Sequence, residues 1–418
     1  MPISQSYASR LYPHLPKIAA HYGTPFHIYD ERGIRETCQS LKQAFTPIPF
    51  MEYFAVKALP NPHILSIIHD EGFGFDCSSI AELTLARQIG ATGEQLFFTS
   101  NNTTPVEFQF AQSNDGAILN LDDITLIDKP PTLPELICFR YNPGPRRTGN
   151  IIIGDPKEAK YGLTYEQMFK AYRIMRDNGV KRFGLHTMIV SNERNADYIL
   201  ETGHMLLTLA HELTQQLGIQ FEFLNLGGGL GIPYHPDDIP LDLAYLSTKL
   251  IQAFRDFADH NGYLPRLVFE SGRYLTGSHG VLVTRAINHK STYREYVGVD
   301  ANMSALMRPA MYGAYHHIEV LGKSLENLKI VDVVGALCEN NDKFAIQREL
   351  PPVDEGDLLI IQDTGAHGHA MGFNYNGKLR PKELLLHEDG SIELIRREET
   401  LTDYFATLIY AENRLTFQ

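Results

Sequence analysis

The stretch MEYFAVKALPN (51–61) decides how the chain is interpreted, because an apolar run in it ends on a single lysine. Residues 53–56 are apolar, Lys57 follows, and a proline comes shortly afterwards. A short apolar run between breakers predicts a buried strand that ends in front of a turn. A lysine there either extends its amine to solvent or serves as a Schiff-base nucleophile. The second role needs partners elsewhere in the chain.

The pattern of a short apolar run followed by a helical pattern recurs along the first two thirds of the chain. In the helical patterns, such as residues 165–179, apolar residues return at three- and four-residue spacing. Eight strands alternating with helices over roughly 250 residues predict a (β/α)8 TIM barrel, with a doubly wound sheet as the alternative. The connection 124–135 contains three prolines and is expected to be the weakest helix. The expected strands are residues 51–57, 72–77, 95–100, 116–122, 136–143, 182–189, 222–229 and 266–273.

After Arg273 the sequence changes to short apolar runs that are separated by turns, with few helical patterns between them. This pattern predicts a C-terminal antiparallel β domain. We expect a barrel domain over residues 25–278, opening with a short strand at 25–30, and a β domain over residues 279–418. Residues 1–24 are expected to pack on the β domain.

Composition limits the classes of partner. The 418 residues include 37 basic and 50 acidic side chains, a net charge of −13, which opposes a large nucleic-acid or anionic-membrane surface. The N-terminal residues lack the basic and apolar segments of a signal peptide, and no apolar run is long enough to cross a bilayer. The four cysteines show no CxxC spacing and fit reduced thiols in the cytoplasm. No pattern predicts a metal site.

Polar residues collect at the carboxyl ends of the expected strands, where barrel enzymes build their active sites. Three consecutive glycines, 227–229, either form a tight turn or present N–H groups to a phosphate. Glu270 is either a solvated carboxylate or the partner that keeps a pyridine nitrogen protonated. With Lys57, these are the requirements of pyridoxal 5′-phosphate. The other residues at these ends are Asp76, Arg140, His186 and Arg273.

On these residues and on longer motifs, the chain resembles the pyridoxal-phosphate-dependent decarboxylases of the alanine-racemase fold (fold type III), and most of all diaminopimelate decarboxylase. The resemblance extends from residue 53 to about residue 400 and implies a homodimer in which each active site borrows residues from the partner's β domain. The motifs are YFAVKALPN (53–61), GFDCSSIAEL (74–83), FRYNPG (139–144), AKYGL (159–163), LNLGGG (224–229), ESGR (270–273), MRPAMYGAYHH (307–317), CENND (338–342), NYNGKLRP (374–381) and LIRREET (394–400).

The resemblance also implies a role for each matching residue. Lys57 would hold the cofactor as a Schiff base, and Cys338 would deliver a proton to Cα across the dimer interface. A buried structural thiol is the alternative for Cys338. The residues expected to bind the cofactor are Lys57, Asp76, His186, Ser191, Gly228, Gly229, Glu270, Gly272, Arg273 and Tyr375. Those expected to bind the substrate are Arg273, Arg308, Tyr312, Glu339 and Tyr375.

The sequence departs from the family pattern at several positions. In GLHTMIVS (184–191), Met188 replaces a histidine that stacks on the cofactor ring, and Val190 replaces a glycine. A thioether can lie against an aromatic ring, so we expect cofactor binding to survive. Ser271 replaces the proline of an EPGR motif, and His367 stands where a tyrosine is common. These departures are typical of a divergent branch of the family.

The predicted reaction is the decarboxylation of meso-2,6-diaminopimelate to L-lysine and CO2 in lysine biosynthesis. The partners are then a small amino-acid substrate and a second copy of the chain, with no nucleic acid and no membrane. The nearest alternative is a decarboxylase of the same fold that acts on carboxynorspermidine, ornithine or arginine. A racemase, a non-catalytic carrier of the cofactor and a Schiff-base aldolase are more distant alternatives.

Overall fold

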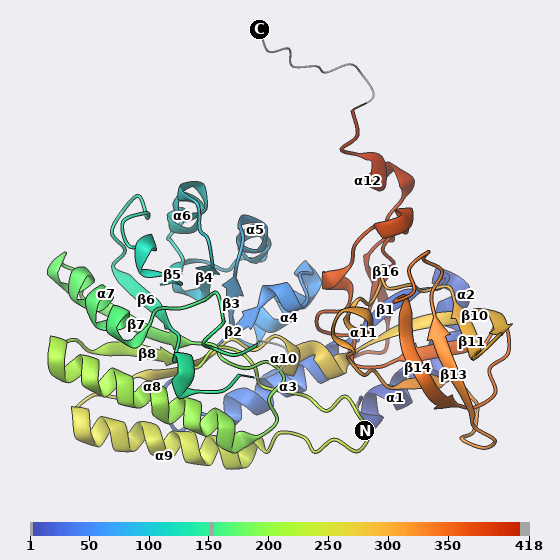
Figure 1. Ribbon diagram of the computed structural model, residues 1–418, viewed down its shortest axis with the longest axis horizontal. Coiled ribbons are helices and arrows are strands. Elements are labelled where there is room, and N and C mark those ends of the chain that lie inside the picture. The colour runs from blue at the N-terminus through green and yellow to red at the C-terminus, as the bar shows by residue number, and fades with distance from the viewer. Residues whose placement is uncertain (1–2, 150–153, 410–418) are drawn as a thin grey trace, which may run out of the picture. The chain divides into compact units, whose positions relative to one another are not determined.

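The structure is a computed structural model that describes residues 3–149 and 154–409. Its internal contacts divide the chain into two compact units. Among the described residues, the first unit contains residues 30–279 with residues 3–5. The second unit contains residues 6–29 and 280–409. Figure 1 shows both, coloured along the chain.

The first unit is built on a closed barrel of eight parallel strands in chain order, all within the described residues. The barrel closes where β2 pairs in parallel with β9, with Phe50 opposite Leu267. Closure confirms the predicted (β/α)8 barrel and excludes the doubly wound sheet. The strands are β2 (Phe50–Ala55), β3 (Gly74–Cys77), β4 (Leu96–Ser100), β5 (Ile118–Leu121), β6 (Leu136–Tyr141), β7 (Arg182–Thr187), β8 (Phe221–Asn225) and β9 (Arg266–Phe269).

Helices connect the barrel strands, and several begin at a capping residue. Asn61 accepts the N–H of His63, and Ser79 accepts that of Glu82. After β5 the proline-rich connection forms a 3₁₀ turn, 124–126, in place of a full helix. In Figure 1, α5 and α6 lie on one side of the strands and α8 and α9 on the other. The helices are α3 (Glu31–Ala44), α4 (Pro62–Asp70), α5 (Ile80–Gln88), α6 (Pro105–Gln112), α7 (Tyr165–Asp177), α8 (Ala196–Leu217), α9 (Leu243–Asn261) and α10 (Arg273–Thr276).

Large apolar side chains fill the interior of the barrel. They come from alternate strand positions, because successive side chains of a strand point to opposite faces. The rings of Phe97 and Phe223 meet edge to face with their centroids 5.8 Å apart. A filled interior leaves the carboxyl ends of the strands as the place for polar groups. The cluster consists of Tyr53, Phe97, Ile118, Leu136, Cys138, Phe223 and Val268.

The second unit is built on a nine-stranded sheet, counted over the described residues. β10 pairs antiparallel with β1, β11 and β15, whereas β11 and β13 run parallel. The predicted C-terminal β domain is confirmed, with this parallel pair inside it. The strands are β1 (Phe26–Asp30), β10 (Gly280–Ser291), β11 (Glu295–Val299), β12 (Ile318–Val320), β13 (Lys329–Val334), β14 (Lys343–Leu350), β15 (Leu358–Ile361), β16 (Lys382–Leu386) and β17 (Ile392–Arg396). The helices are α1 (Gln5–Leu11), α2 (Leu15–Tyr22), α11 (Arg308–Tyr312) and α12 (Leu401–Phe405).

β1 lies in a different unit from the one that its place in the sequence suggested. Residues 25–30 open the expected barrel domain, but Phe26 pairs with Val283 and Tyr29 with Gly280, in the sheet of the second unit. The partner of a strand depends on residues far away in the sequence, so the local pattern identifies the strand but not its sheet. Among the described residues, no helix is both long and apolar enough to cross a bilayer.

Candidate active site

Lys57 lies in the turn that follows the first barrel strand. β2 ends at Ala55, and a 3₁₀ turn, Val56–Ala58, carries the lysine past the end of the strand. Val56 and Ala58 are buried, whereas the lysine is exposed. Its amine therefore leaves the core at the carboxyl end of a strand, where barrel enzymes hold their ligands.

Glu270 follows β9 directly and is buried. Asn225 Nδ2 donates to its Oε1 at 2.7 Å, and His186 Nε2 lies 3.1 Å from its Oε2. The other ring nitrogen of His186 lies 3.0 Å from the amide donor of Asn120. Because Asn120 donates to Nδ1, the imidazole proton is on Nε2 and is donated to Glu270.

These neighbours keep Glu270 in its charged form. Burial by itself raises the pKa of Glu270, but His186, Lys57 and the hydrogen bond from Asn225 outweigh burial and bring the pKa below its usual value. Burial and the charge of Glu270 raise the pKa of Asp76, and Lys57 lowers it only in part. The two carboxyl groups therefore divide into an anionic Glu270 and an Asp76 that favours its protonated form.

Several buried oxygens at this end of the barrel have no hydrogen-bond partner among the described residues. They include Oδ1 of Asp76 on β3, Oδ1 of Asn120 on β5 and the hydroxyl of Ser271. A buried polar atom without a partner costs on the order of 1–3 kcal/mol, so such atoms indicate where a polar ligand binds. A pyridine ring with polar substituents would supply the missing partners.

The glycine run after β8 forms a turn that favours glycine for two reasons. Gly227 and Gly229 have φ angles of 72° and 105°, a region that other residues enter with strain. A Cβ on Gly228 would lie 2.5 Å from the carbonyl oxygen of Glu270, so the turn packs directly on the segment that carries this acid. The Gly227 N–H donates to Asn225 Oδ1 at 2.8 Å, which joins the turn to the Asn225–Glu270 pair.

Three other residues expected to bind the cofactor lie in two further segments of the first unit. Gly272 is packed so closely that a Cβ there would lie 2.6 Å from the Cβ of Ala58, in the 3₁₀ turn after β2. Arg273 begins α10, is buried, and donates from Nη1 to the hydroxyl of Tyr234 at 2.5 Å. Ser191 lies partly exposed in the loop after β7.

These residues fit pyridoxal 5′-phosphate. The cofactor needs an amine to hold it, an anion for its ring nitrogen and N–H groups for its phosphate. Lys57, Glu270 and the glycine turn would supply these three functions, each from a segment that follows a strand of the same barrel.

The remaining predicted residues lie on three adjoining loops of the second unit. Asp342 accepts the N–H of Met303 at 2.7 Å and the N–H of Leu337 at 2.8 Å. It therefore joins the loop before α11 to the loop that carries Cys338. Asn376 Oδ1 accepts the N–H of Cys338 at 2.9 Å. This hydrogen bond joins the loop of Cys338 to the third loop, which carries Tyr375.

Within these loops the predicted residues differ in exposure. Arg308, at the start of α11, is buried, and its Nη1 lies 2.9 Å from His316 Nε2. Tyr312 and Tyr375 are 46% and 56% exposed, so in a single chain their rings face away from the core of their own unit. Cys338 is exposed, which excludes a buried structural thiol, and Glu339 is partly exposed.

Sequence analysis did not identify the residues that hold the site residues in place. Asn225 and Asn120 fell inside expected strands without a role. A polar residue at an inward position of an apolar strand was the available signal, because a buried amide needs a partner. Tyr234 lies in a loop and gave no comparable signal.

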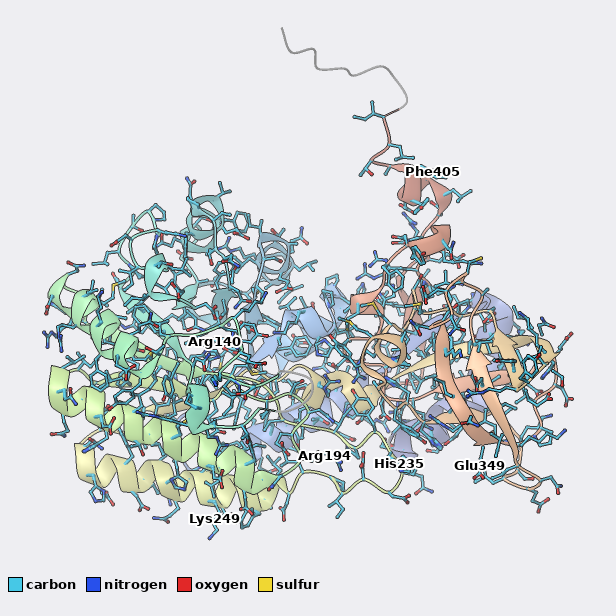
Figure 2. All side chains as sticks on the ribbon, viewed as in Figure 1. Arg140, Arg194, His235, Lys249, Glu349 and Phe405 are labelled. Atoms are coloured by element: carbon cyan, nitrogen blue, oxygen red, sulfur yellow. The ribbon has the colours of Figure 1, made fainter. Side chains whose placement is uncertain are left out.

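Arg140 has a structural role that the sequence did not show. It lies on β6 within the first unit, where Figure 2 labels it, and is buried. Its guanidinium group lies 4.3 Å from the ring centroid of Tyr161. It also donates to Asp122 Oδ1 and to the carbonyl oxygen of Met188, each at 3.3 Å. Arg140 thus fixes the backbone at Met188.

Comparison with known proteins shows the family of the chain. Residues 31–277 match the family model described as pyridoxal-dependent decarboxylase, pyridoxal binding domain. The chain is 47% identical to Protein TabA of Pseudomonas amygdali pv. tabaci, over 97% of this chain and 96% of that protein. It is 36% identical to the diaminopimelate decarboxylase of Methanothermobacter thermautotrophicus, over 93% and 92%.

Among solved structures, the crystal structure of diaminopimelate decarboxylase from M. jannaschii superposes with a TM-score of 0.88. That protein is 30% identical to this chain, and the alignment covers 94% of each. The same enzyme has also been solved in complex with L-lysine. On the family model, the relatives and the solved structures, the chain belongs to the pyridoxal-dependent decarboxylases of fold type III, as an amino-acid decarboxylase that uses pyridoxal 5′-phosphate.

Proposed function

We propose that the enzyme decarboxylates meso-2,6-diaminopimelate to L-lysine and CO2. Two relatives support this substrate, since the proteins of M. thermautotrophicus and M. jannaschii are diaminopimelate decarboxylases. TabA, at 47% identity, carries a different name, and we therefore give diaminopimelate as the proposed substrate. The alternative is a decarboxylase of the same fold for another basic amino acid: carboxynorspermidine, ornithine or arginine.

The observation that carries the proposal is the buried guanidinium of Arg308. Diaminopimelate has a second carboxylate far from the reacting carbon, and arginine binds carboxylates through two parallel hydrogen bonds. The hydrogen bond between Arg308 and His316 orients the planar group. Ornithine and arginine have no distal carboxylate and would require acidic residues in its place.

Lys57 and Glu270 have different roles toward the cofactor. When bound, pyridoxal phosphate supplies an electron sink for the pair released from the Cα–carboxylate bond. Lys57 holds the cofactor until the substrate amine replaces it. Glu270, kept anionic by His186 and Asn225, maintains the proton on the ring nitrogen.

The second unit supplies most of the expected substrate-binding residues and the proton donor, and Arg273 of the first unit is also expected to bind the substrate. Arg308 and Tyr312 bind the distal carboxylate, and Glu339 binds the distal amine. After CO2 has left, the Cys338 thiol donates its proton to Cα, which completes the amino acid. Because Tyr312, Cys338 and Tyr375 are exposed in the single chain, we propose a homodimer in which the partner's loops serve each site.

The cytoplasm is the proposed location, in keeping with four free cysteines: Cys38, Cys77, Cys138 and Cys338. This part of the proposal is tested by fractionating cells that produce the full chain.

Release of CO2 by the purified enzyme with added pyridoxal phosphate tests the substrate. Diaminopimelate, ornithine, arginine, lysine and carboxynorspermidine are compared side by side. We expect turnover of diaminopimelate alone, with lysine as the product. An Arg308→Met variant should lose this turnover and keep its bound cofactor. Turnover of ornithine or arginine in place of diaminopimelate would contradict the assignment of Arg308 and favour the alternative.

A further inference from the structure

Met188 makes an unusual contact with the glycine turn. Its thioether sulfur accepts the N–H of Gly228, with the nitrogen and the sulfur 3.1 Å apart. A Cβ on Gly227 would lie only 2.9 Å from the same sulfur. The methionine side chain therefore lies directly on the turn that is expected to receive the cofactor's phosphate.

This contact uses a donor that the phosphate also needs. Gly228 is one of the two glycines whose N–H groups are expected to bind the phosphate. A thioether is a weak acceptor, whereas a phosphate oxygen forms a short, charge-assisted hydrogen bond. A single N–H does not satisfy both fully, so the stronger acceptor displaces the weaker one.

The surroundings allow the methionine side chain to move without the backbone. Arg140 donates to the carbonyl oxygen of Met188 at 3.3 Å, and the hydroxyl of the neighbouring Thr187 donates to the carbonyl oxygen of Tyr141 at 2.9 Å. These bonds fix the main chain where β7 ends. The Met188 side chain is partly exposed and has three rotatable bonds, so it can adopt another rotamer at low cost.

We propose that the Met188 sulfur takes the place of the cofactor's phosphate as the acceptor of the Gly228 N–H. Its sulfur satisfies the Gly228 N–H while the phosphate is absent, which keeps the glycine turn in its binding conformation. The sulfur gives up this N–H when the phosphate arrives. Phosphate binding in this chain therefore competes with an internal hydrogen bond. The proposal concerns the cofactor site and holds for any amino-acid substrate.

Affinity measurements on the full chain freed of cofactor test the competition. Inorganic phosphate and pyridoxal phosphate are titrated separately into the wild type and into the M188L and M188A variants. Both substitutions remove the sulfur, so the Gly228 N–H has no competing acceptor. We expect both variants to bind each ligand about two- to tenfold more tightly, the equivalent of one ordinary net hydrogen bond. M175L, a buried methionine variant in α7, is the matched control and should bind as the wild type does.

The outcomes separate the hydrogen bond from simple steric effects. Tighter binding by M188A alone would mean that the side-chain volume obstructs the phosphate, and it would overturn the proposed role of the sulfur. Unchanged or weaker binding by both variants would overturn it as well.

Nuclear magnetic resonance of the wild type gives a second readout that needs no substitution. With labelled glycine amides and methionine methyl groups, phosphate should shift both the Gly228 amide proton and the Met188 methyl resonance. If the cofactor binds while the Gly228 amide resonance stays unchanged, that N–H still donates to the sulfur, and Met188 does not take the place of the phosphate.

Discussion

Lys57 is the residue whose loss should change the protein most directly. The exposed side chain of Lys57 lies in the turn after β2, and the other side chains of this turn are buried. Replacement by alanine removes the group that attaches the cofactor, so activity should fall by roughly a hundredfold or more. Absorption spectra should lose the band of the lysine-linked cofactor. K249A, which alters an exposed lysine of α9 labelled in Figure 2, is the control and should keep both. A coloured and active K57A protein would contradict the assignment.

His186 controls the charge of Glu270, and this role predicts a change in pH dependence. His186 donates to Glu270 and is among the groups that lower its pKa. In H186F this donor is gone, so the pKa of Glu270 rises and the acid protonates at a higher pH. The hydrogen bond from His186 stabilises the carboxylate, so its loss makes the acid easier to protonate. We expect the acidic limb of the kcat/KM profile to move to higher pH.

Two further variants identify the cause of such a shift. H186Q retains an N–H donor and should restore part of the profile. H204Q, on the surface of α8, should leave the profile in place. If H186F and the wild type share one acidic limb, His186 does not set the charge of Glu270.

At the scale of secondary structure, Glu52 connects strands β2 and β9. It lies opposite Phe269 in the ladder, is fully buried, and its Oε1 accepts the N–H of Ser271. Its Oε2 has no hydrogen-bond partner among the described residues. Burial raises the pKa of Glu52 well above its usual value, so the folded protein favours the neutral carboxylic acid. Ser271 stands where the EPGR motif has a proline, and a proline has no N–H to donate to Glu52.

This burial predicts a stabilising substitution. A raised folded pKa adds stability below the unfolded pKa of about 4.5, and this stability is lost as the pH rises. The E52Q variant is neutral at every pH and avoids that loss. Urea unfolding should therefore show E52Q to be more stable than the wild type at pH 8, and the difference should shrink towards pH 4.

The comparison with a second substitution makes the test specific. E52L leaves the Ser271 N–H without an acceptor and should be about 1–3 kcal/mol less stable than E52Q at both pH values. E135Q changes an exposed acid and should show no pH-dependent difference. If E52Q is less stable than the wild type at pH 8, Glu52 is charged in the folded protein.

At the scale of the whole molecule, buried groups of the second unit make its folding sensitive to acid. In the first unit the shifts are mixed: burial raises the pKa of Glu52 and of Asp76, which favours folding as the pH falls, and lowers the pKa of His279 to about 4, which opposes it. In the second unit, burial lowers the pKa of His27 to about 4. Although burial alone would raise it, the pKa of Glu383 is lowered to about 2 by His369, Arg396 and Tyr29.

Groups with a lowered pKa stabilise the fold above their unfolded pKa and lose this contribution as the pH falls. The contribution of His27 is lost between pH 6.5 and about 4, and that of Glu383 between pH 4.5 and about 2. Each shift corresponds to on the order of 3 kcal/mol. Hydrogen exchange followed by mass spectrometry should therefore show faster exchange in the second unit as the pH falls from 6.5 towards 2.

Two variants check the origin of this acid sensitivity. E383Q should be less stable than the wild type at pH 7 and should show a flatter dependence below pH 4.5. Glu349 is exposed on β14, as Figure 2 shows, and E349Q should follow the wild type. If exchange in the second unit of the wild type stays unchanged between pH 7 and pH 3, His27 and Glu383 do not make this unit sensitive to acid.

The sequence by itself determined the alternation of strands and helices, the lysine after the first barrel strand and the glycine turn after the seventh. These features depend on local periodicity and on backbone conformations that few residues adopt, so they can be recognised within a short window. The helical pattern of residues 165–179 forms the helix α7, because its apolar residues recur at helical spacing. The motifs around Lys57 and Glu270 predicted the cofactor because each residue type suits one part of its chemistry.

Only the tertiary structure decided which residues act on one another. His186 meets Glu270 across 84 positions of sequence, and Met188 meets Gly228 across 40. β1 was assigned to the barrel by its place in the chain, yet it pairs with β10, more than 250 positions away. Such contacts form when the barrel closes and the sheet assembles. They depend on the summed packing of the whole chain, which no local pattern contains.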